Sequence, residues 1–345
     1  MAKKTTIGGQ ALLEGLMMVG PERVAMAVRK ADGEIVVEEW PAGNLSKAAK
    51  IPFVRGSVRL FHQLVTGTKT LMRSADYIEE ALEKPATPEP VAAVEADAPV
   101  VDAAAVSSAS PAESAEKPEK KPGRLEQYLE KHTEVVLYGS VVLGLAFSVG
   151  LFYFLPWMLV FLVPPLKALN ASKVFSDKIL LNLCVGLVRI AIFILYLYLT
   201  SLMKDIRRVW MYHGAEHKTI HCYENGLPLT VENVRTFSTR HPRCGTSFLF
   251  IVLIVSIVVF SFFTWWSPVV NLLVHLALLP VVAGIAFEII RWSGRHDRNF
   301  LSRILSAPGL ALQALTTREP EDAMLEVAIR ATERVIPERS DADVW

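Results

Sequence analysis

The sequence is poor in cysteine, carries almost no net charge and lacks a phosphate-binding loop. Three cysteines in 345 residues are too few for a disulfide framework, so we expect reduced thiols. The formal net charge of +1 gives nucleic-acid binding no electrostatic support, and no nucleic-acid partner is expected. No Gly-Lys-Ser or Gly-Lys-Thr follows a glycine-rich segment, which argues against nucleotide binding.

The N-terminal segment also lacks an apolar stretch long enough for a cleavable signal peptide. Yet 52% of the residues are hydrophobic and the mean hydropathy is +0.33, values typical of a membrane protein. We therefore predict a mainly α-helical membrane protein with a four-transmembrane-helix core, whose first spans act as their own insertion signals. The four predicted spans are residues 135–163, 179–203, 246–266 and 269–290.

Basic residues flank these spans unequally. Lysine and arginine are concentrated before the first span, between the second and third, and after the fourth, whereas the segment between the first and second has few. Because basic loops stay in the cytoplasm, both termini and the 204–245 loop are predicted to be cytoplasmic. We expect a multi-pass protein of the bacterial cytoplasmic (inner) membrane, in contact with membrane lipid.

The segments outside the membrane have distinct compositions. Residues 1–83 predict a small N-terminal cytoplasmic α+β segment, with a hairpin over 25–39 and a basic helix over 57–82. Residues 84–123 are rich in proline, alanine, glutamate and lysine, and are predicted to be a disordered linker.

The rest of the chain is divided in the same way. Residues 124–299 form the predicted four-helix membrane domain, which includes the 204–245 loop. Residues 300–345 predict a C-terminal cytoplasmic helical tail that breaks at Pro308 and Gly309.

The most informative motif, His213-Gly-Ala-Glu216-His217, directly follows the second span. If that span continues as a helix to about residue 225, the two histidines lie on one face, where both imidazoles can bind one metal ion. This His-x-x-Glu-His order is the inverted zincin pattern. We predict that His213 and His217 bind Zn²⁺ and that Glu216 is the catalytic general base. The alternative for Glu216 is a salt bridge to Lys218, Arg208 or Arg235.

A catalytic zinc site needs a third protein ligand and one open position. Four of the eight histidines and two of the three cysteines lie between residues 213 and 244. We predict that His241 or Cys244, near the start of the third span, completes the set. His221 and Glu232 are further candidates, although His221 lies two helical turns from His213 and is expected to have a supporting or surface role.

Other polar residues allow two interpretations each. Arg189 lies inside the second span and should meet a polar partner in the bundle, His275 or Asn271. Glu288 could orient a ligand histidine or pair with Arg291 or Arg295. Gln10 and Glu14, in a glycine-rich N-terminal motif, could fold onto the metal site or belong to a tight structural turn.

Five segments together resemble the YqhQ-like family, whose members are bacterial membrane proteins described as predicted metal-dependent enzymes. The resemblance covers nearly the whole chain except 84–123, a linker longer than is usual in the family. It implies that His213, Glu216, His217, His241 and Cys244 occupy the family's characteristic positions. The segments are GGQALLEGLMM (8–18), RGSVRLFHQL (55–64), YHGAEHKTI (212–220), HPRCGTSF (241–248) and PGLALQALTTREPEDAMLEVAI (308–329).

These patterns lead to one functional hypothesis and one alternative. The hypothesis is a zinc-dependent membrane hydrolase acting at the cytoplasmic membrane face on a peptide or lipid-derived substrate. The alternative is a noncatalytic membrane scaffold or regulator that binds a partner protein and has a structural metal site or none. An open ligand position beside Glu216 would favour the enzyme, and four protein ligands would favour the scaffold.

Overall fold

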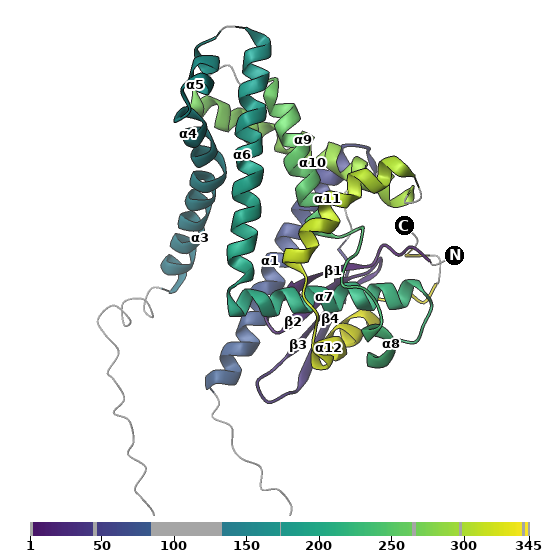
Figure 1. The fold of residues 1–345 in the computed structure, drawn as a ribbon. Coiled ribbons are helices and arrows are strands. Elements are labelled where there is room, and N and C mark those ends of the chain that lie inside the picture. The colour runs from purple at the N-terminus through teal and green to yellow at the C-terminus, as the bar shows by residue number, and fades with distance from the viewer. Residues whose placement is uncertain are drawn as a thin grey trace, which may run out of the picture. The chain divides into compact units, whose positions relative to one another are not determined.

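The computed structural model describes residues 3–43, 47–83, 133–172, 174–263, 267–296, 299–339 and 342–343. The predicted linker, residues 84–123, lies outside them. The chain divides into two units, one made of Met1–Pro85 with Gly150–Trp345 and the other of Ala86–Val149. The first unit holds a small sheet, several long apolar helices and the His213–His217 motif (Figure 1).

Four strands form an antiparallel meander in chain order: β1 (Gly8–Leu12), β2 (Gly15–Val19), β3 (Arg23–Arg29) and β4 (Ile35–Pro41). The hairpin predicted over residues 25–39 is confirmed, since β3 pairs with β4 along its whole length. Gly33, with φ +91°, lies in its turn. The first hairpin, β1 with β2, occupies the glycine-rich motif and turns at Leu13 and Glu14.

The sheet is covered on both faces because its apolar side chains alternate. Leu16 and Met18 pack against α7 (Lys204–Glu224) and α12 (Asp322–Glu333). Met17 and Met26 point the other way, toward Tyr77 of α1 (Val54–Glu83). Thus α12, which the sequence placed in a tail, shares a core with the sheet and α7. The first unit also contains two short helices, η1 (Lys47–Lys50) and α8 (Val231–Arg235).

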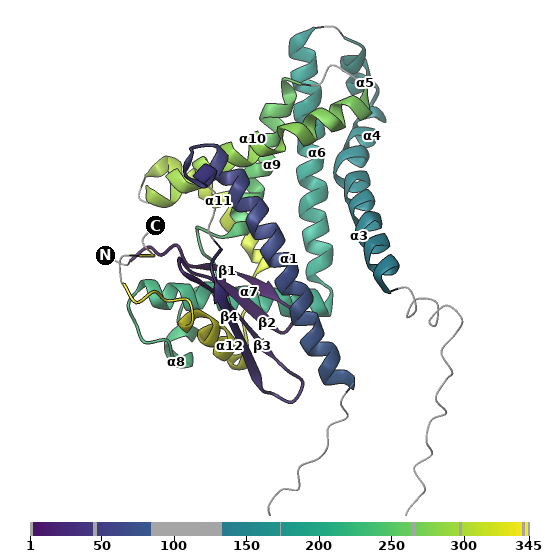
Figure 2. The same ribbon diagram turned by 180° about the vertical axis from the view of Figure 1, so that it is seen from behind.

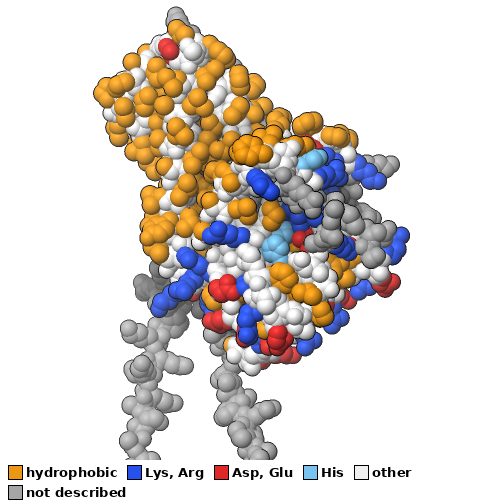
Figure 3. All heavy atoms as spheres, turned by 45° about the vertical axis from the view of Figure 1, so that its right-hand side comes forward, with side chains coloured by type: hydrophobic (Ala, Val, Ile, Leu, Met, Phe, Trp, Pro, Cys, Tyr) orange, Lys and Arg blue, Asp and Glu red, His pale blue; other side chains and the backbone are white. Residues whose placement is uncertain are grey.

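Three helical segments among the described residues are long and apolar enough to cross a membrane: Gly139–Phe161, α6 (Phe175–Ser201) and Val269–Arg295 of α10 (Pro268–Arg295). The first comprises most of α3 (Thr133–Val149), the π-helical turn η2 (Gly150–Phe154) and α4 (Leu155–Phe161), and α5 (Pro164–Ala171) follows. The third predicted span corresponds to α9 (Gly245–Ser261), which is apolar but shorter, at 17 residues. Hydrophobic side chains cover the end of the molecule that holds α4 to α6, and charged ones gather around the sheet (Figure 3). These features are those of a membrane protein.

The second span does not continue as one helix to about residue 225, although the helix that carries the motif does end there. The apolar helix α6 ends at Ser201, Met203 has an extended backbone with φ −71° and ψ 133°, and α7 begins at Lys204. In both ribbon views α7 runs across the axis of α6 (Figures 1 and 2). The physical reason is the charged sequence Lys-Asp-Ile-Arg-Arg at the start of α7, which cannot extend an apolar segment without a large desolvation cost.

The predicted break at Pro308 and Gly309 is wrong, because α11 (Phe300–Thr316) continues through both residues. Proline removes only one helical hydrogen bond, and the packing of α11 on α9 offsets this loss. Gly309 makes the close approach possible, since an added Cβ would lie 2.5 Å from the Ser247 hydroxyl oxygen. The helix ends instead before Pro320.

Two other polar residues find partners that the sequence did not indicate. The Arg189 side chain donates to the carbonyl oxygen of Phe152 (2.9 Å), where we expected His275 or Asn271. The π-helical turn around Phe152 leaves such carbonyls available. Glu288 pairs with Arg55 of α1 (2.7 Å) instead of Arg291 or Arg295, because α1 crosses α10 at close range.

Candidate metal centre

Helix α7 presents the His213–His217 motif from inside the fold. Almost every residue from Tyr212 to Ile220 is buried. Gly214 allows the chain after α11 to approach, since a Cβ there would lie 2.1 Å from the Arg318 carbonyl oxygen. The Arg318 amide in turn donates to the Trp210 carbonyl (2.9 Å). The helix is therefore held between the sheet and residues 317–318, which limits its rotation.

Backbone carbonyls orient both histidines of the motif. The Nδ1 atom of His213 lies 2.7 Å from the Thr316 carbonyl oxygen, and Nδ1 of His217 lies 2.6 Å from that of Thr239. A carbonyl can only accept, so both Nδ1 atoms carry hydrogen and donate. Nε2 is therefore the nitrogen of each ring that would bind a metal ion after losing any proton it carries. A metal-binding histidine commonly has its other nitrogen held by such a contact.

Cys244 approaches the two histidines from the start of α9. It is the N-cap of that helix, and its Sγ accepts from the Thr246 amide (3.3 Å). The same Sγ lies 3.2 Å from His213 Nε2. Burial raises the pKa of the Cys244 thiol, but His217 and His213 outweigh burial and hold that pKa well below its usual value. Burial opposes the charged form of His213, yet the neighbouring thiolate raises its pKa. Both histidines therefore favour the thiolate form of Cys244, the form that binds metals.

One ligand atom each from His213, His217 and Cys244 lies within 4.8 Å of the other two. Zinc bonds of about 2.0–2.3 Å to nitrogen and sulfur can be accommodated by a group of this size. The structure thus brings together three of the four predicted metal ligands.

Glu216 projects from α7 beside these ligands. Its Oε1 accepts from the Gly9 amide of β1 (2.8 Å), and only 6% of the residue is exposed. Burial is the main cause that raises the pKa of this carboxyl, although His213 and His217 oppose the shift. The three bases considered as salt-bridge partners bind other acids instead: Lys218 pairs with Glu319, Arg208 with Glu14, and Arg235 with Asp322.

His241 belongs to a different group, formed with His221 and Glu224. Its Nε2 lies 3.5 Å from the Glu224 carboxylate, and its amide donates to Gln313 (2.8 Å). Burial lowers the pKa of His241 to about 4, so this ring is neutral near pH 7. The ring centroids of His241 and His217 are 5.6 Å apart, which makes the two groups neighbours. Glu232, the remaining candidate, is exposed on α8.

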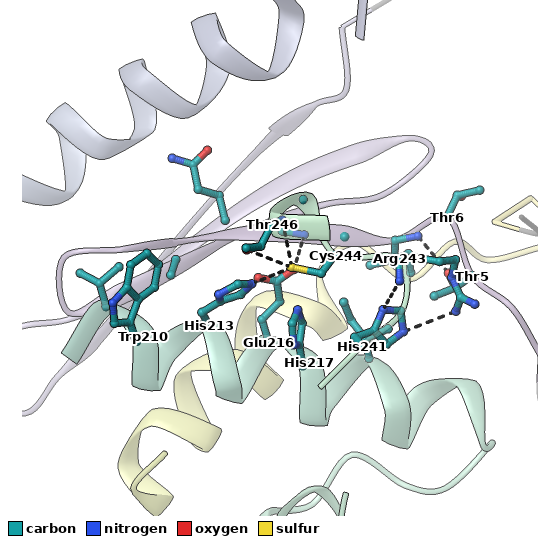
Figure 4. A pocket seen from close by; sticks show the side chains of 18 residues that line it. Thr5, Thr6, Trp210, His213, Glu216, His217, His241, Arg243, Cys244 and Thr246 are labelled. Atoms are coloured by element: carbon teal, nitrogen blue, oxygen red, sulfur yellow. Dashed lines mark hydrogen bonds between the residues drawn. The ribbon is translucent and has the colours of Figure 1, made fainter. Parts of the chain in front are cut away.

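The predicted metal ligands and Glu216 line a cavity of about 290 Å³. Its walls are residues 5–11, one face of α7, His241 and residues 243–246. Figure 4 shows Trp210, His213, Glu216 and His217 on the same side of α7, facing Cys244 and Thr246. A second cavity of about 180 Å³ lies against Cys244 and Gly245 and is lined by Leu60, Phe248 and Phe287 from α1, α9 and α10. A polar site therefore adjoins an apolar one next to the membrane helices.

Sequence reasoning missed two contributors to this site. Glu224 lies at the end of α7, two turns beyond Glu216, and binds Arg243, His241 and the Thr5 amide (2.8 Å to the last). The sequence did contain a signal for Glu224, because it follows His217 by seven residues and Glu216 by eight and so lies on the same side of the helix. The backbone amide of Gly9 could not be identified as a Glu216 partner, although the glycine-rich motif did suggest a segment that folds onto the site. Glu14 of that motif binds Arg208 (2.6 Å).

Comparison with known proteins gives a family but no activity. The family model described as "Protein of unknown function (DUF1385)" matches residues 51–338. The chain is 33% identical over 330 residues to "Uncharacterized protein YqhQ" of Bacillus subtilis (strain 168), covering 94% of this chain and 90% of that relative. No solved structure matches the chain. The family part of the resemblance is thus confirmed, whereas the description of its members as metal-dependent enzymes has no support in these comparisons. The chain belongs to the DUF1385 family of YqhQ-like proteins.

Proposed function

We propose that this protein is a zinc-dependent hydrolase of the bacterial cytoplasmic membrane, with its site at the cytoplasmic face. One arrangement carries the proposal. His213, His217 and Cys244 offer ligand atoms within 4.8 Å of one another, beside the buried Glu216, in a cavity of about 290 Å³. A buried acid beside candidate ligands in a cavity is the arrangement that favours an enzyme over a purely structural site.

The residues present fit a catalytic zinc ion. Two imidazoles whose Nδ1 atoms are held by carbonyls, and one cysteine sulfur beside them, are ligands that zinc prefers once they have lost their Nε2 and Sγ protons. Three protein ligands leave a fourth position open, which is typical of catalytic sites, whereas structural sites have four. Of the two candidates for the third ligand we assign Cys244, because His241 is bound to Glu224. Zinc held there would polarise a substrate carbonyl and make water more acidic.

Glu216 is assigned proton transfer. Its burial raises the pKa of the carboxyl, which brings a carboxylate closer to the range useful for a general base near neutral pH. The Gly9 amide holds one carboxylate oxygen and thereby orients the group. The site residues are therefore His213, His217 and Cys244 as ligands and Glu216 as general base.

The proposed topology has four spans, with both termini and the 204–245 loop in the cytoplasm. The 17 residues of α9 extend about 25 Å as a helix, slightly less than the hydrocarbon core of about 30 Å. Local thinning of the bilayer accommodates such a difference. The excess of lysine and arginine in the 204–245 loop supports its cytoplasmic location.

One observation favours a second candidate, acyl transfer by a cysteine nucleophile. Cys244 is at a helix N-terminus, 3.2 Å from His213, whose other nitrogen is held by a carbonyl. This is also an arrangement for nucleophilic catalysis. The two mechanisms differ in their inhibitors. A chelator abolishes zinc-dependent hydrolysis and leaves cysteine catalysis unchanged.

The test is metal analysis of the full-length protein purified in detergent without chelators. We expect nearly one zinc per chain in the wild type and in Glu216→Gln, because Glu216 is not a ligand. His217→Ala should lose the metal. His221→Ala is the matched control: this histidine also lies on α7, but its Nε2 contacts the Arg240 carbonyl (2.9 Å), so zinc should remain.

Two results contradict the proposal. If Glu216→Gln loses zinc as completely as His217→Ala, Glu216 is a ligand or an essential support of one, and the general-base role fails. If the wild type neither contains zinc nor takes it up, the hydrolase fails and the scaffold hypothesis replaces it.

A further inference from the structure

We propose that the substrate is a peptide, which binds in an extended conformation along the free edge of β1. This inference rests on the proposed hydrolase and adds the class of its substrate. The sheet order is β1-β2-β3-β4, so β1 is an edge strand that pairs only with β2 among the described strands. Residues Gly8 to Ala11 of this strand are partly exposed and line the cavity that holds Glu216.

The direction of the β1 amides follows from one hydrogen bond. In a strand, the N–H and C=O of one residue point to the same side, and the side alternates along the chain. The Gly9 amide donates to Glu216, so Gly9 faces the free edge, and so does Ala11 two residues later. Gly8, Gln10 and Leu12 then face β2, with which β1 is paired in register.

Three backbone groups on this edge are available to a ligand. Within the described part of the chain, the Gly9 carbonyl and the Ala11 amide and carbonyl make no hydrogen bond. They are spaced as in a sheet that lacks its next strand. An extended peptide carries the complementary amide and carbonyl at that spacing, and strand addition of this kind is a common mode of peptide recognition.

The Glu216 carboxylate lies on the same edge of the sheet, next to the Gly9 amide. The Glu216 Oε1 atom occupies the place beside the Gly9 amide that a carbonyl of an added strand would otherwise take. The added peptide therefore pairs with Ala11 and moves away from β1 at the Gly9 amide, which puts its next carbonyl in the cavity beside Glu216, His213 and Cys244. We assign this carbonyl to the bond that is cleaved.

The reaction is peptide-bond hydrolysis, with water as the only co-reactant. The water oxygen forms a bond to the carbonyl carbon, and Glu216 accepts a proton from the water. The C–N bond then breaks, and Glu216 passes the proton to the leaving nitrogen. The products are a carboxylic acid and an amine, and the proton left on the acid passes to the amine, which gives a carboxylate and an ammonium ion.

A lipid ester can form fewer hydrogen bonds with this strand edge than a peptide can. It has a carbonyl acceptor but no adjacent N–H donor, so the Gly9 and Ala11 carbonyls would stay unpaired. The apolar cavity beyond Cys244 could nevertheless hold an acyl chain, so lipid is the outcome that the experiment must separate from peptide.

The experiment uses zinc-loaded, full-length protein in detergent. A tryptic digest of a bacterial membrane proteome is incubated with wild type and with Glu216→Gln, and new peptide termini are identified by mass spectrometry. Vesicles of phosphatidylethanolamine and phosphatidylglycerol are incubated in parallel. We expect cleaved peptides with the wild type, none with Glu216→Gln, and intact lipids.

The best-cleaved peptide is then synthesised, and kcat/KM is compared in two variants. Ala11→Pro removes the edge amide, and edge strands tolerate proline. Asp322→Asn, at an exposed position on α12 outside the cavity, is the control. We expect kcat/KM to fall about tenfold in Ala11→Pro, the effect of one lost hydrogen bond, and to stay within about twofold in Asp322→Asn. Zinc content and thermal unfolding verify that both variants are folded.

If Ala11→Pro does not fold, the peptide substrate is changed in place of the protein. N-methylation of single peptide amides is tested on the wild type, and two positions spaced by two residues should each lose cleavage. The proposal is overturned if Ala11→Pro or every N-methylated peptide is cleaved like its parent. It is also overturned if lipids alone, or neither substrate, are hydrolysed by protein that contains zinc. Absence of zinc would instead refute the proposed hydrolase.

Discussion

Gly9 links the N-terminal sheet to the candidate metal centre. Its amide binds Glu216, and an added Cβ would lie 2.5 Å from the Met17 carbonyl oxygen and 3.2 Å from Glu216 Cδ. At the adjacent Gly8, an added Cβ meets nothing within 4 Å. One glycine is therefore required by close packing and the other is not.

We predict that Gly9→Ala lowers the free energy of unfolding by about 1–3 kcal/mol through overpacking. It should also displace Glu216 and reduce hydrolysis. Gly8→Ala should change stability by less than about 0.5 kcal/mol. Thermal unfolding in detergent and zinc content measure both effects. Equal melting temperatures for the two variants would contradict the packing argument.

The lowered pKa of Glu224 predicts that the stability of the protein depends on pH. Burial raises the pKa of this carboxyl, but His241, Arg243 and the Thr5 amide outweigh burial and hold the pKa below its ordinary value. The unfolded value is about 4.3. Because the folded pKa is the lower one, the stabilisation is fully present above the unfolded pKa and is lost as pH falls through the folded pKa.

Glu224→Gln should therefore cost about 1.5–3 kcal/mol at pH 7. The difference from wild type should shrink as the pH falls through and below about 4. Asp322→Asn is the control, since Asp322 and its partner Arg235 are each 56% exposed and such pairs contribute about 0–1 kcal/mol. Melting temperatures measured from pH 7 to pH 3 check the prediction. A difference that is independent of pH would exclude the titration of Glu224 as its cause.

At the scale of elements, the crossing of α1 over α10 joins the N-terminal segment to an apolar helix. Gly284 of α10 lies so close that an added Cβ would be 1.9 Å from the Phe53 carbonyl oxygen, and Gly56 of α1 makes a similar approach to Phe287. The Arg55–Glu288 pair lies at the same crossing. Backbone contact, rather than charge alone, therefore holds these helices together.

We predict that Gly284→Ala separates α1 from α10 and costs about 1–3 kcal/mol. Gly144→Ala, in α3, is the control, because a Cβ there meets nothing within 4 Å and alanine favours helix. Thermal unfolding in detergent measures the difference. If Gly284→Ala is as stable as Gly144→Ala, the helices do not cross at this distance.

At the scale of the whole molecule, the proposed topology can be tested by cysteine labelling. Lys167 and Glu232 are both exposed, and the topology puts them on opposite sides of the membrane. With Cys184 replaced by serine, an impermeant maleimide should label Lys167→Cys in cells whose outer layers alone are permeabilised. It should label Glu232→Cys only after the cytoplasmic membrane is opened. The native Cys222 and Cys244 are buried and give little background. Labelling of both positions in intact cells would contradict the proposed orientation.

Local features of the sequence determined several parts of this protein. The spacing of His213, Glu216 and His217 puts them on one helical face wherever that helix lies, because helical periodicity is a local property. Apolar length identified the membrane helices α6 and α10, and a glycine turn identified the β3–β4 hairpin. Family membership likewise follows from the sequence.

Only the tertiary structure decided how these parts meet. It separated α7 from α6, grouped Cys244 with the two motif histidines and His241 with Glu224, and brought Gly9 to Glu216 across 207 residues. Sequence spacing cannot predict such contacts, because they depend on which helix and sheet faces pack together and on glycines that permit backbone contact. The types of candidate ligand were therefore visible in the sequence, whereas the grouping of His213, His217 and Cys244 and the position of the β1 edge beside them depend on long-range packing.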